Sequence, residues 1–223
     1  MNRIPILLVV LACTTAALAE GRADDVERLQ NSATVLREIM SAPDKGVPEE
    51  IFSSARCVAV LPNMLKAAFV AGGAYGKGVA SCRTAKGWSA PAFFSLKGGS
   101  FGLQIGGESA DIVMLIMNEE GMQNLLASKF KLGADASVAA GPVGRHADAS
   151  TDWKMRAQVL TYSRARGIFA GISLNGAAIT QHKEDTRDFY GRMAPFKTIL
   201  RGNIAAPKEA EPWRDALAKY GGK

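Results

Sequence analysis

The chain has 223 residues, of which 48% are hydrophobic and 22% are charged, and this composition excludes a disordered chain and fits one globular domain with its own core. The net charge of +6 and the isoelectric point near 9.3 suggest an anionic partner, and the alternative is a soluble protein that is simply basic. Lipid headgroups, nucleic acid and acidic glycans are all anionic, so the net charge alone does not distinguish among these partners.

Residues 1–19 have the pattern of a signal peptide. Arg3 gives a positive start, an apolar run follows from Ile4 to Ala16, and Ala17-Leu18-Ala19 is an A-x-A cleavage site. The sequence therefore predicts an exported protein, periplasmic or associated with the cell envelope, that begins at Glu20. The alternative is a lipidated Cys13, because Val10-Leu11-Ala12-Cys13 weakly resembles a lipobox. No other apolar segment is long enough to span a bilayer, so no transmembrane span is expected in the mature chain.

Two cysteines, Cys57 and Cys82, remain if the signal peptide is removed. A pair of cysteines in an oxidising compartment predicts a disulfide, and two buried free thiols are the alternative. A metal site is not expected, because His146 and His182 are the only histidines and neither has a second ligand at a suitable spacing.

Two helices are predicted before the first strand. Apolar residues from Asp24 to Ser41 recur at steps of three and four, which indicates an amphipathic helix. The segment 20–42 carries three arginines and five acidic residues, so docking on a sheet is favoured over binding to an anionic membrane surface. A short second helix is predicted from Pro48 to Ala55.

The stretch from Arg56 to Gly107 contains ten glycines, six basic residues and no acidic residue. Glycine at this density disfavours helix, and in strands it marks bulges and bends. We therefore predict strongly curved antiparallel strands with a positive surface. Lys86-Gly87 suits a hairpin turn, and Pro91 limits the following strand to an edge or a bulge.

After the second helix, the sequence predicts a series of short strands with one inserted helix, followed by helices near the C-terminus. Predicted strands lie at 58–61, 67–71, 101–105, 112–117, 132–140, 155–164 and 168–174, and predicted helices at 119–128, 183–190 and around Trp213, Leu217 and Tyr220. Asn175-Gly176 is the strongest hairpin signal. The predicted fold class is α+β, with a curved, barrel-like antiparallel sheet, helices at both termini and one inserted helix.

The sequence contains no convincing motif for catalysis. The run Gly72–Gly78 has the wrong spacing for a phosphate-binding loop, and Gly171–Asn175 lacks the second glycine of a nucleophile elbow. Glu108 with Asp111 fits a solvated strand end better than an acid–base pair, and two loop aspartates are too few for calcium. We therefore predict no enzyme and no cofactor. An aromatic stacking cluster for nucleic acid is also lacking.

Four stretches resemble the SYLF domain, a lipid-binding family: CVAVLPNMLKAAFVAGGAYGKGV, GWSAPAFFSLKGGSFGLQIGGESADIVMLIMN, SKFKLGADASVAAGPVGR and LTYSRARGIFAGISLNGAAI. The resemblance implies one SYLF-like domain over residues 20–200, followed by a tail at 201–223 with a short helix. It also implies binding of phosphoinositides or other anionic lipids, and in eukaryotic relatives a link to membranes and actin.

Lipid binding in this family is associated with a basic N-terminal amphipathic helix, whereas the segment 24–41 is acidic here. We therefore place the predicted lipid-binding charge on the body of the domain. The candidate residues are Lys66, Lys77, Arg83, Lys97, Lys129, Lys131, Arg145, Arg164 and Arg166. The alternative function is a structural or protein-interaction role in the envelope, in which the basic face meets an acidic protein or glycan.

Overall fold

The structure is a computed structural model that describes residues 4–42, 46–68, 73–99, 106–127, 129–144, 157–165, 168–171 and 174–221. Within these ranges the side chains at 4–20, 66–68, 108, 165 and 168–169 are not described.

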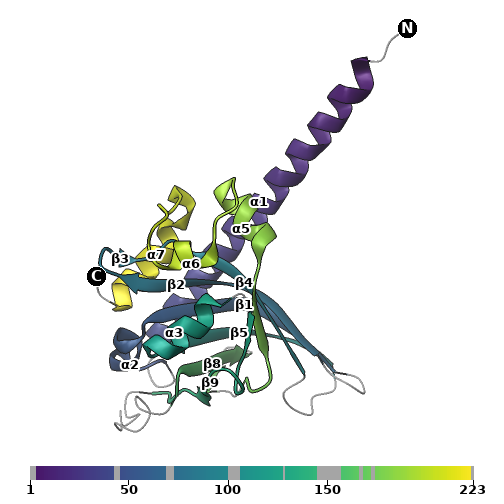
Figure 1. Ribbon diagram of the computed structural model, residues 1–223. Coiled ribbons are helices and arrows are strands. Elements are labelled where there is room, and N and C mark those ends of the chain that lie inside the picture. Colours follow the sequence, from purple (N-terminus) through teal and green to yellow (C-terminus); the bar gives the residue numbers. More distant parts are fainter. Residues whose placement is uncertain are drawn as a thin grey trace.

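In the described residues, helices lie toward both ends of the chain, and α3 lies between strands (Figure 1). They are α1 (Ile4–Ser41), α2 (Glu49–Ser54), α3 (Glu119–Leu126), α5 (Lys183–Tyr190), α6 (Phe196–Leu200), the 3-10 helix η1 (Lys208–Ala210) and α7 (Glu211–Gly221).

The strands of the described chain form one sheet that curls into half a barrel (Figure 1). They are β1 (Cys57–Ala68), β2 (Gly73–Thr84), β3 (Gly87–Trp88), β4 (Ala92–Gly99), β5 (Gly106–Ile116), β6 (Lys129–Lys131), β7 (Val138–Ala140), β8 (Val159–Ala165), β9 (Ile168–Gly171) and β10 (Ala178–Gln181). The strand order is β6-β10-β4-β2-β1-β5-β8-β7, while β3 pairs with β2 and β9 pairs with β8. The predicted α+β class with a curved sheet and helices at both ends is thereby confirmed.

The sheet is mixed, which differs from the purely antiparallel sheet predicted. Strand β7 runs parallel to β8, with Val138 opposite Val159, whereas the other strand pairs are antiparallel. Parallel neighbours cannot be joined by a tight hairpin. Hydrophobic patterning shows where strands lie but does not show their relative direction, so the sequence did not reveal this pairing.

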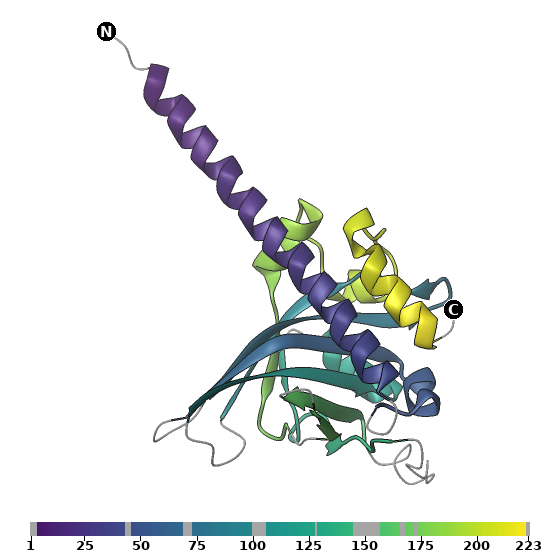
Figure 2. The same cartoon turned by 180° about the vertical axis from the view of Figure 1, so that it is seen from behind.

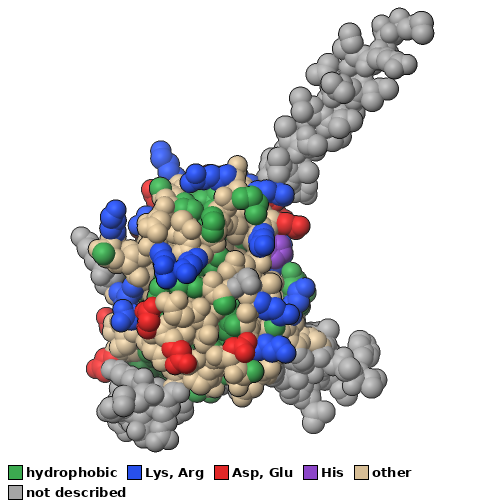
Figure 3. Space-filling model, in the orientation of Figure 1, with side chains coloured by type: hydrophobic (Ala, Val, Ile, Leu, Met, Phe, Trp, Pro, Cys, Tyr) green, Lys and Arg blue, Asp and Glu red, His purple; other side chains and the backbone are tan. Residues whose placement is uncertain are grey.

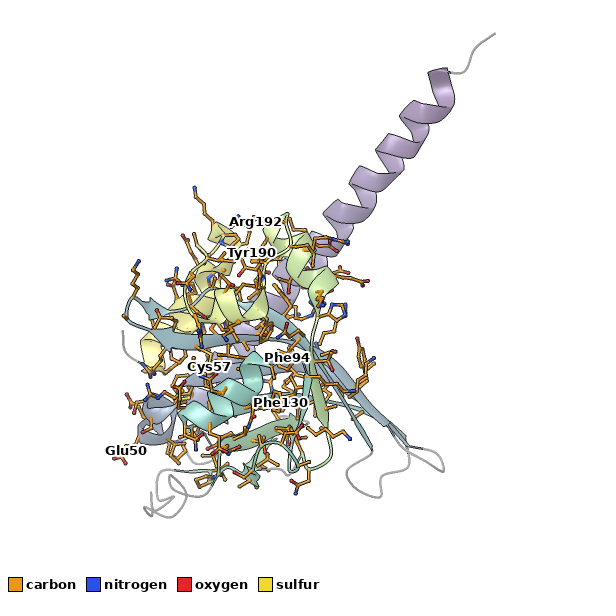
Figure 4. The ribbon with its side chains drawn as sticks, viewed as in Figure 1. Glu50, Cys57, Phe94, Phe130, Tyr190 and Arg192 are labelled. Carbon is orange, nitrogen blue, oxygen red and sulfur yellow. A yellow bond between two sulfur atoms is a disulfide. The ribbon has the colours of Figure 1, made fainter. Side chains whose placement is uncertain are left out.

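Each face of the sheet has its own apolar core, because successive side chains of a strand point to opposite faces. Val58 and Val60 of β1 point to the face covered by α1, α2 and α7, which we call the outer face (Figure 2). Cys57, Ala59 and Leu61 point to the opposite, inner face, where α3 and α6 pack. Figure 4 shows Cys57, Phe94 and Phe130 on this inner side, beside α3. The predicted docking of the segment 24–41 on the sheet is confirmed, since Leu29, Ala33 and Leu36 are fully buried there.

Several helices and strands lie where capping residues and apolar runs in the sequence predicted them. Asn118 caps α3 by accepting a hydrogen bond from the amide of Gly121, and α5 ends at Gly191 in the left-handed conformation. The strand predicted at 112–117 is β5, and it is buried on both faces. Trp213 of α7 is fully buried, so the C-terminal helix docks on the domain as expected.

Other local predictions were wrong in detail. The turn at Asn175-Gly176 exists, but β10 after it pairs with β4 and β6 instead of β9. The Gly176 amide donates to the carbonyl of Leu132, so the turn packs on the β6 segment. The strand predicted at 132–140 is interrupted, because a turn with Gly133 at positive φ separates β6 from β7. The two strands predicted at 58–61 and 67–71 are one strand, β1, up to Ala68. The strand predicted at 101–105 lies outside the described residues.

Cys57 and Cys82 form a disulfide that joins β1 to β2, where the two residues stand directly opposite each other. Both cysteines are fully buried.

Replacing both cysteines by alanine is expected to lower the free energy of unfolding by about 3.5 kcal/mol, because the disulfide closes a loop with a sequence separation of 25 residues. Urea unfolding of the oxidised wild type and of the double variant measures the difference. The variant should also lose the sensitivity to reductant that the wild type shows. A midpoint unchanged by both reductant and substitution would contradict the prediction.

Candidate functional site

Four side chains form a continuous line across the outer face, which we call the outer-face row: Leu65, Tyr75, Lys97 and Lys131. The strand register sets this line. Leu65 on β1 stands opposite Tyr75 on β2, and Tyr75 stands opposite Lys97 on β4. Ala178 on β10 then lies between Lys97 and Lys131. Residues directly opposite one another in a sheet point to the same face, so the row presents two large apolar groups beside two cations.

In the described part of the chain, α1 crosses the sheet and leaves the ends of the long strands without a helix over them (Figure 2). Leu65 and Tyr75 lie toward those ends of β1 and β2. Leu65 is 63% exposed and Tyr75 is 41% exposed, which sets them apart from the fully buried valines nearer the centre of the same face. The ammonium group of Lys97 lies 5.4 Å from the centre of the Tyr75 ring. Lys97, Lys129 and Lys131 are all exposed.

A hollow of about 310 Å³ separates α1 from the outer-face row. Asp24 and Glu27 of α1 line one wall, while Leu65 and Tyr75 line the other. Arg28 and Lys77 also line the hollow. The apolar end of the row, Leu65 and Tyr75, therefore lies next to the carboxylates of α1. The other end of the row consists of the lysines on β4 and β6.

Lys77 is half-buried and takes part in a cluster of charges between α1, β2 and α5. Its ammonium nitrogen lies 2.9 Å from Oδ1 of Asp185, and Nη1 of Arg28 lies 2.9 Å from Oδ2 of the same carboxylate. Nδ1 of His182 lies 3.0 Å from Asp185 Oδ1 and 3.4 Å from the Asp185 amide nitrogen. This nitrogen caps α5 when it carries no proton, and it can donate to the carboxylate when protonated.

Asp185 is the anion on which this cluster depends. Burial alone raises its pKa, but hydrogen bonds with His182 and Lys77 and the charge of Arg28 outweigh burial and lower the pKa to about 2. The carboxylate therefore stays ionised at neutral pH and holds both cations.

Arg164 belongs to a second cluster, which joins the other end of α1 to the sheet. Its Nη2 lies 2.6 Å from Oδ2 of Asp111 on β5, and its Nη1 pairs with Glu38 of α1. The second Asp111 oxygen accepts a hydrogen bond from the amide of Asn63, which has a positive φ of 53° at the bulge in β1. Burial raises the pKa of Asp111, while the Asn63 amide opposes that rise. This cluster fixes the bulge and the helix together.

Arg83 is held by backbone groups near α2. Its side chain donates to the carbonyls of Ala55 and Ser53, and the guanidinium lies 4.6 Å from the centre of the Trp88 ring. Lys66 stands in β1 opposite Ala74, and its side chain is not described. Arg145 and Arg166 lie outside the described residues.

Of the sequence-predicted residues, the structure thus brings Lys97, Lys129 and Lys131 together on an exposed part of the outer face. It places Lys77, Arg83 and Arg164 on the same face, but against the protein's own carboxylates and carbonyls. Sequence reasoning missed Leu65 and Tyr75, because alternation along a strand does not tell which half of a face a helix covers. Figure 3 shows another side of the domain, where basic side chains lie in separate groups with acidic ones among them.

Within the described part of the chain, no three His, Cys, Asp or Glu side chains gather closely enough to hold a metal ion. None of the helices in those residues combines the length and apolar character required to cross a bilayer.

Comparison with known proteins places the chain in a recognised family. The profile of the Ysc84 family, described as "Las17-binding protein actin regulator", matches residues 97–220, and the chain is a member of this family. The resemblance to SYLF domains in the sequence is thereby confirmed.

Curated relatives extend the match over most of the chain. SH3 domain-containing YSC84-like protein 1 of Bos taurus is 31% identical over 198 residues, which cover 86% of this chain and 58% of the relative. Protein YSC84 of Saccharomyces cerevisiae is 34% identical over 194 residues, which cover 82% of this chain and 41% of the relative. The chain thus spans less than two thirds of the length of these relatives, and their names mention no catalytic activity.

Replacing Asp185 by alanine is expected to lower the free energy of unfolding at pH 7 by about 2–3 kcal/mol, because Arg28 and Lys77 lose their shared anion. The pKa of this carboxyl is lower in the folded chain than its ordinary value of 3.8. Its stabilising contribution is therefore full above about pH 4 and declines as the pH falls toward 2. Urea unfolding at pH 7 and pH 2.5 measures both effects.

The matched control for this prediction is Asp188→Ala on the same helix. Asp188 pairs with Arg187, whose side chain is 49% exposed, so the loss should stay below about 1 kcal/mol. Equal losses for the two variants, or a loss at Asp185 that does not shrink at low pH, would contradict the argument.

Proposed function

We propose that this domain is a non-catalytic module that binds anionic lipid at a membrane surface through the outer-face row and the neighbouring Lys129. The observation that carries the proposal is the exposure of Leu65 and Tyr75 beside three exposed lysines on one face. Apolar and tyrosine side chains enter the interfacial region of a bilayer, while lysines remain at the level of the headgroups.

The expected energies agree with weak, reversible binding. Each lysine near an anionic surface contributes about 1 kcal/mol, so three lysines contribute about 3 kcal/mol. Full burial of a leucine or aromatic side chain adds about 1.5–3 kcal/mol. Neither contribution alone retains a protein on a membrane, but the two together do, as for other two-signal anchors.

Lys77, Arg83 and Arg164 have a smaller part in this proposal. Lys77 and Arg164 neutralise buried or half-buried carboxylates, and Arg83 serves backbone carbonyls. A headgroup would have to replace those partners before it could bind the cations. We therefore assign the first contact with lipid to Lys97, Lys129 and Lys131.

A second candidate function is suggested by the description of the family as Las17-binding regulators of actin. On this alternative, the same face binds an acidic protein or glycan. The two candidates differ in whether vesicles without protein are sufficient for retention.

We also propose that the chain is exported and begins at Glu20 after cleavage of residues 1–19. The A-x-A pattern supports the cleavage, and the buried Cys57–Cys82 disulfide is of the kind that persists in an oxidising compartment.

Flotation with liposomes tests lipid binding. The wild type is expected to float with anionic vesicles of phosphatidylglycerol and phosphatidylcholine, to remain unbound with pure phosphatidylcholine, and to dissociate as salt rises. The variant Lys97→Glu/Lys129→Glu/Lys131→Glu should lose at least tenfold in partitioning, because each cation is replaced by an anion. Leu65→Ser/Tyr75→Ser should lose partitioning at every salt concentration.

The matched control is Lys197→Glu/Arg201→Glu/Lys208→Glu, which changes the net charge equally at exposed residues on α6, its C-cap and η1. It should retain most of the binding. Equal losses in the test and control variants would contradict the outer-face row as the contact surface. Failure of the wild type to float with anionic vesicles would favour the protein or glycan partner.

Expression of the full chain in a bacterial host with a periplasm tests export. Mass spectrometry of the periplasmic protein is expected to give an N-terminus at Glu20, and Ala17→Asp/Ala19→Asp should block processing. A lipidated mass starting at Cys13 would favour the lipoprotein alternative, and a cytoplasmic chain of full length would contradict export.

A further inference from the structure

Asp25 of α1 is a buried carboxyl group with incomplete hydrogen bonding. The residue is only 1% exposed. Its Oδ1 accepts a hydrogen bond of 2.6 Å from Arg28 Nη1, while its Oδ2 is buried and has no hydrogen-bond partner among the described residues. An ionised carboxylate needs several donors to compensate for burial, and one donor to one oxygen does not suffice.

A second carboxylate competes with Asp25 for the same cation. Nη1 of Arg28, which bonds to Asp25, also lies 2.9 Å from Oδ2 of Asp185. The charged and titratable groups around Asp25 are Arg28 on the same helix, Lys77 on β2, and Asp185 with its neighbour His182 at the start of α5. Lys77 and His182 both contact Asp185, so Asp25 has Arg28 as its direct partner.

We propose that Asp25 is a proton-binding site that couples the docking of helix α1 to pH. When Asp25 is protonated it is neutral, so it no longer repels the Asp185 carboxylate. Arg28 can then pair with Asp185 without competition from a second anion. Ionised Asp25 places a second buried negative charge against Asp185, which weakens the attachment of α1 to β2 and α5. The inference concerns α1 itself and does not rest on lipid binding.

The electrostatics of the site agree with this geometry. Burial raises the pKa of Asp25 most, the charge of Asp185 raises it further, and Arg28 and Lys77 oppose the rise, with a result of about 7 against an ordinary value of 3.8. The docked helix therefore binds more protons than the released helix between about pH 4 and pH 7. Docking weakens as the pH rises through that range and becomes constant above it.

Release of α1 would have a defined structural effect. Leu29, Ala33 and Leu36 are fully buried against the outer face, and α1 covers the region around Lys77. The device would therefore control how much of the outer face is accessible, with the covered half exposed more often at alkaline pH.

Hydrogen exchange of the full chain in the absence of lipid tests the proposal. The opening constant of the amides from residue 24 to 41, corrected for intrinsic exchange, is expected to rise about tenfold from pH 6 to pH 8 in the wild type. Asp25→Asn should abolish this rise. His182→Asn, which keeps a capping acceptor at α5, should retain it and so separate Asp25 from the imidazole.

Three outcomes would overturn the proposal: equal opening of α1 at both pH values, a tenfold rise that persists in Asp25→Asn, or an equal rise in the amides of β1, which would show that the whole fold responds. If Asp25→Asn does not fold, an NMR titration of the Asp25 carboxyl carbon in the wild type decides the matter. A midpoint near pH 7 supports the proton site, and a midpoint near pH 4 overturns it.

Discussion

Burial of residues 57–61 of β1 and 110–116 of β5 on both faces is the constraint on which the rest of the structure depends. These two strands pair at the centre of the sheet, and their side chains pack alternately into two separate apolar cores. Neither core can form without its own cover, so helices are required on both sides. Helices α1, α2 and α7 supply the outer cover, and α3 and α6 supply the inner one. The contact between distant ends of the chain follows, because the first and last helices share one face.

The helices cover only part of the outer face, and the covered and uncovered parts differ in their side chains. Under α1 the sheet is apolar and its cations are paired with carboxylates from α1, α5 and β5. Beyond α1 the same strands carry Leu65, Tyr75 and Lys97 without such cover. The edge of α1 thus separates the buried, ion-paired part of the outer face from its exposed part. Any movement of α1 would shift that boundary, which connects the charge cluster at Asp25 to the exposed row without a direct contact between them.

Much of the fold could be predicted because its signals are local. The cap at Asn118, the glycine that ends α5 and the apolar run of β5 each depend on a few neighbouring residues. The pairing of β10 with β4 and β6 could not be predicted, since it depends on contacts with residues far away in the chain. The same limit applies to the site. Lys77 and Lys97 come from one basic stretch, but Lys77 pairs with Asp185, 108 residues away, and Lys97 remains exposed.

Strand β6 ends the strand order of the described sheet, and its composition protects that end. It has three residues, with exposed Lys129 and Lys131 on either side of buried Phe130. An unpaired strand can recruit the edge of another molecule, and closely spaced lysines on a very short edge oppose such pairing by charge repulsion between copies. The two lysines therefore oppose edge-to-edge pairing of β6 with another copy, whatever else they bind. Evolution toward a different ligand could change the sign of these side chains, but neutral apolar replacements would expose the edge to self-association.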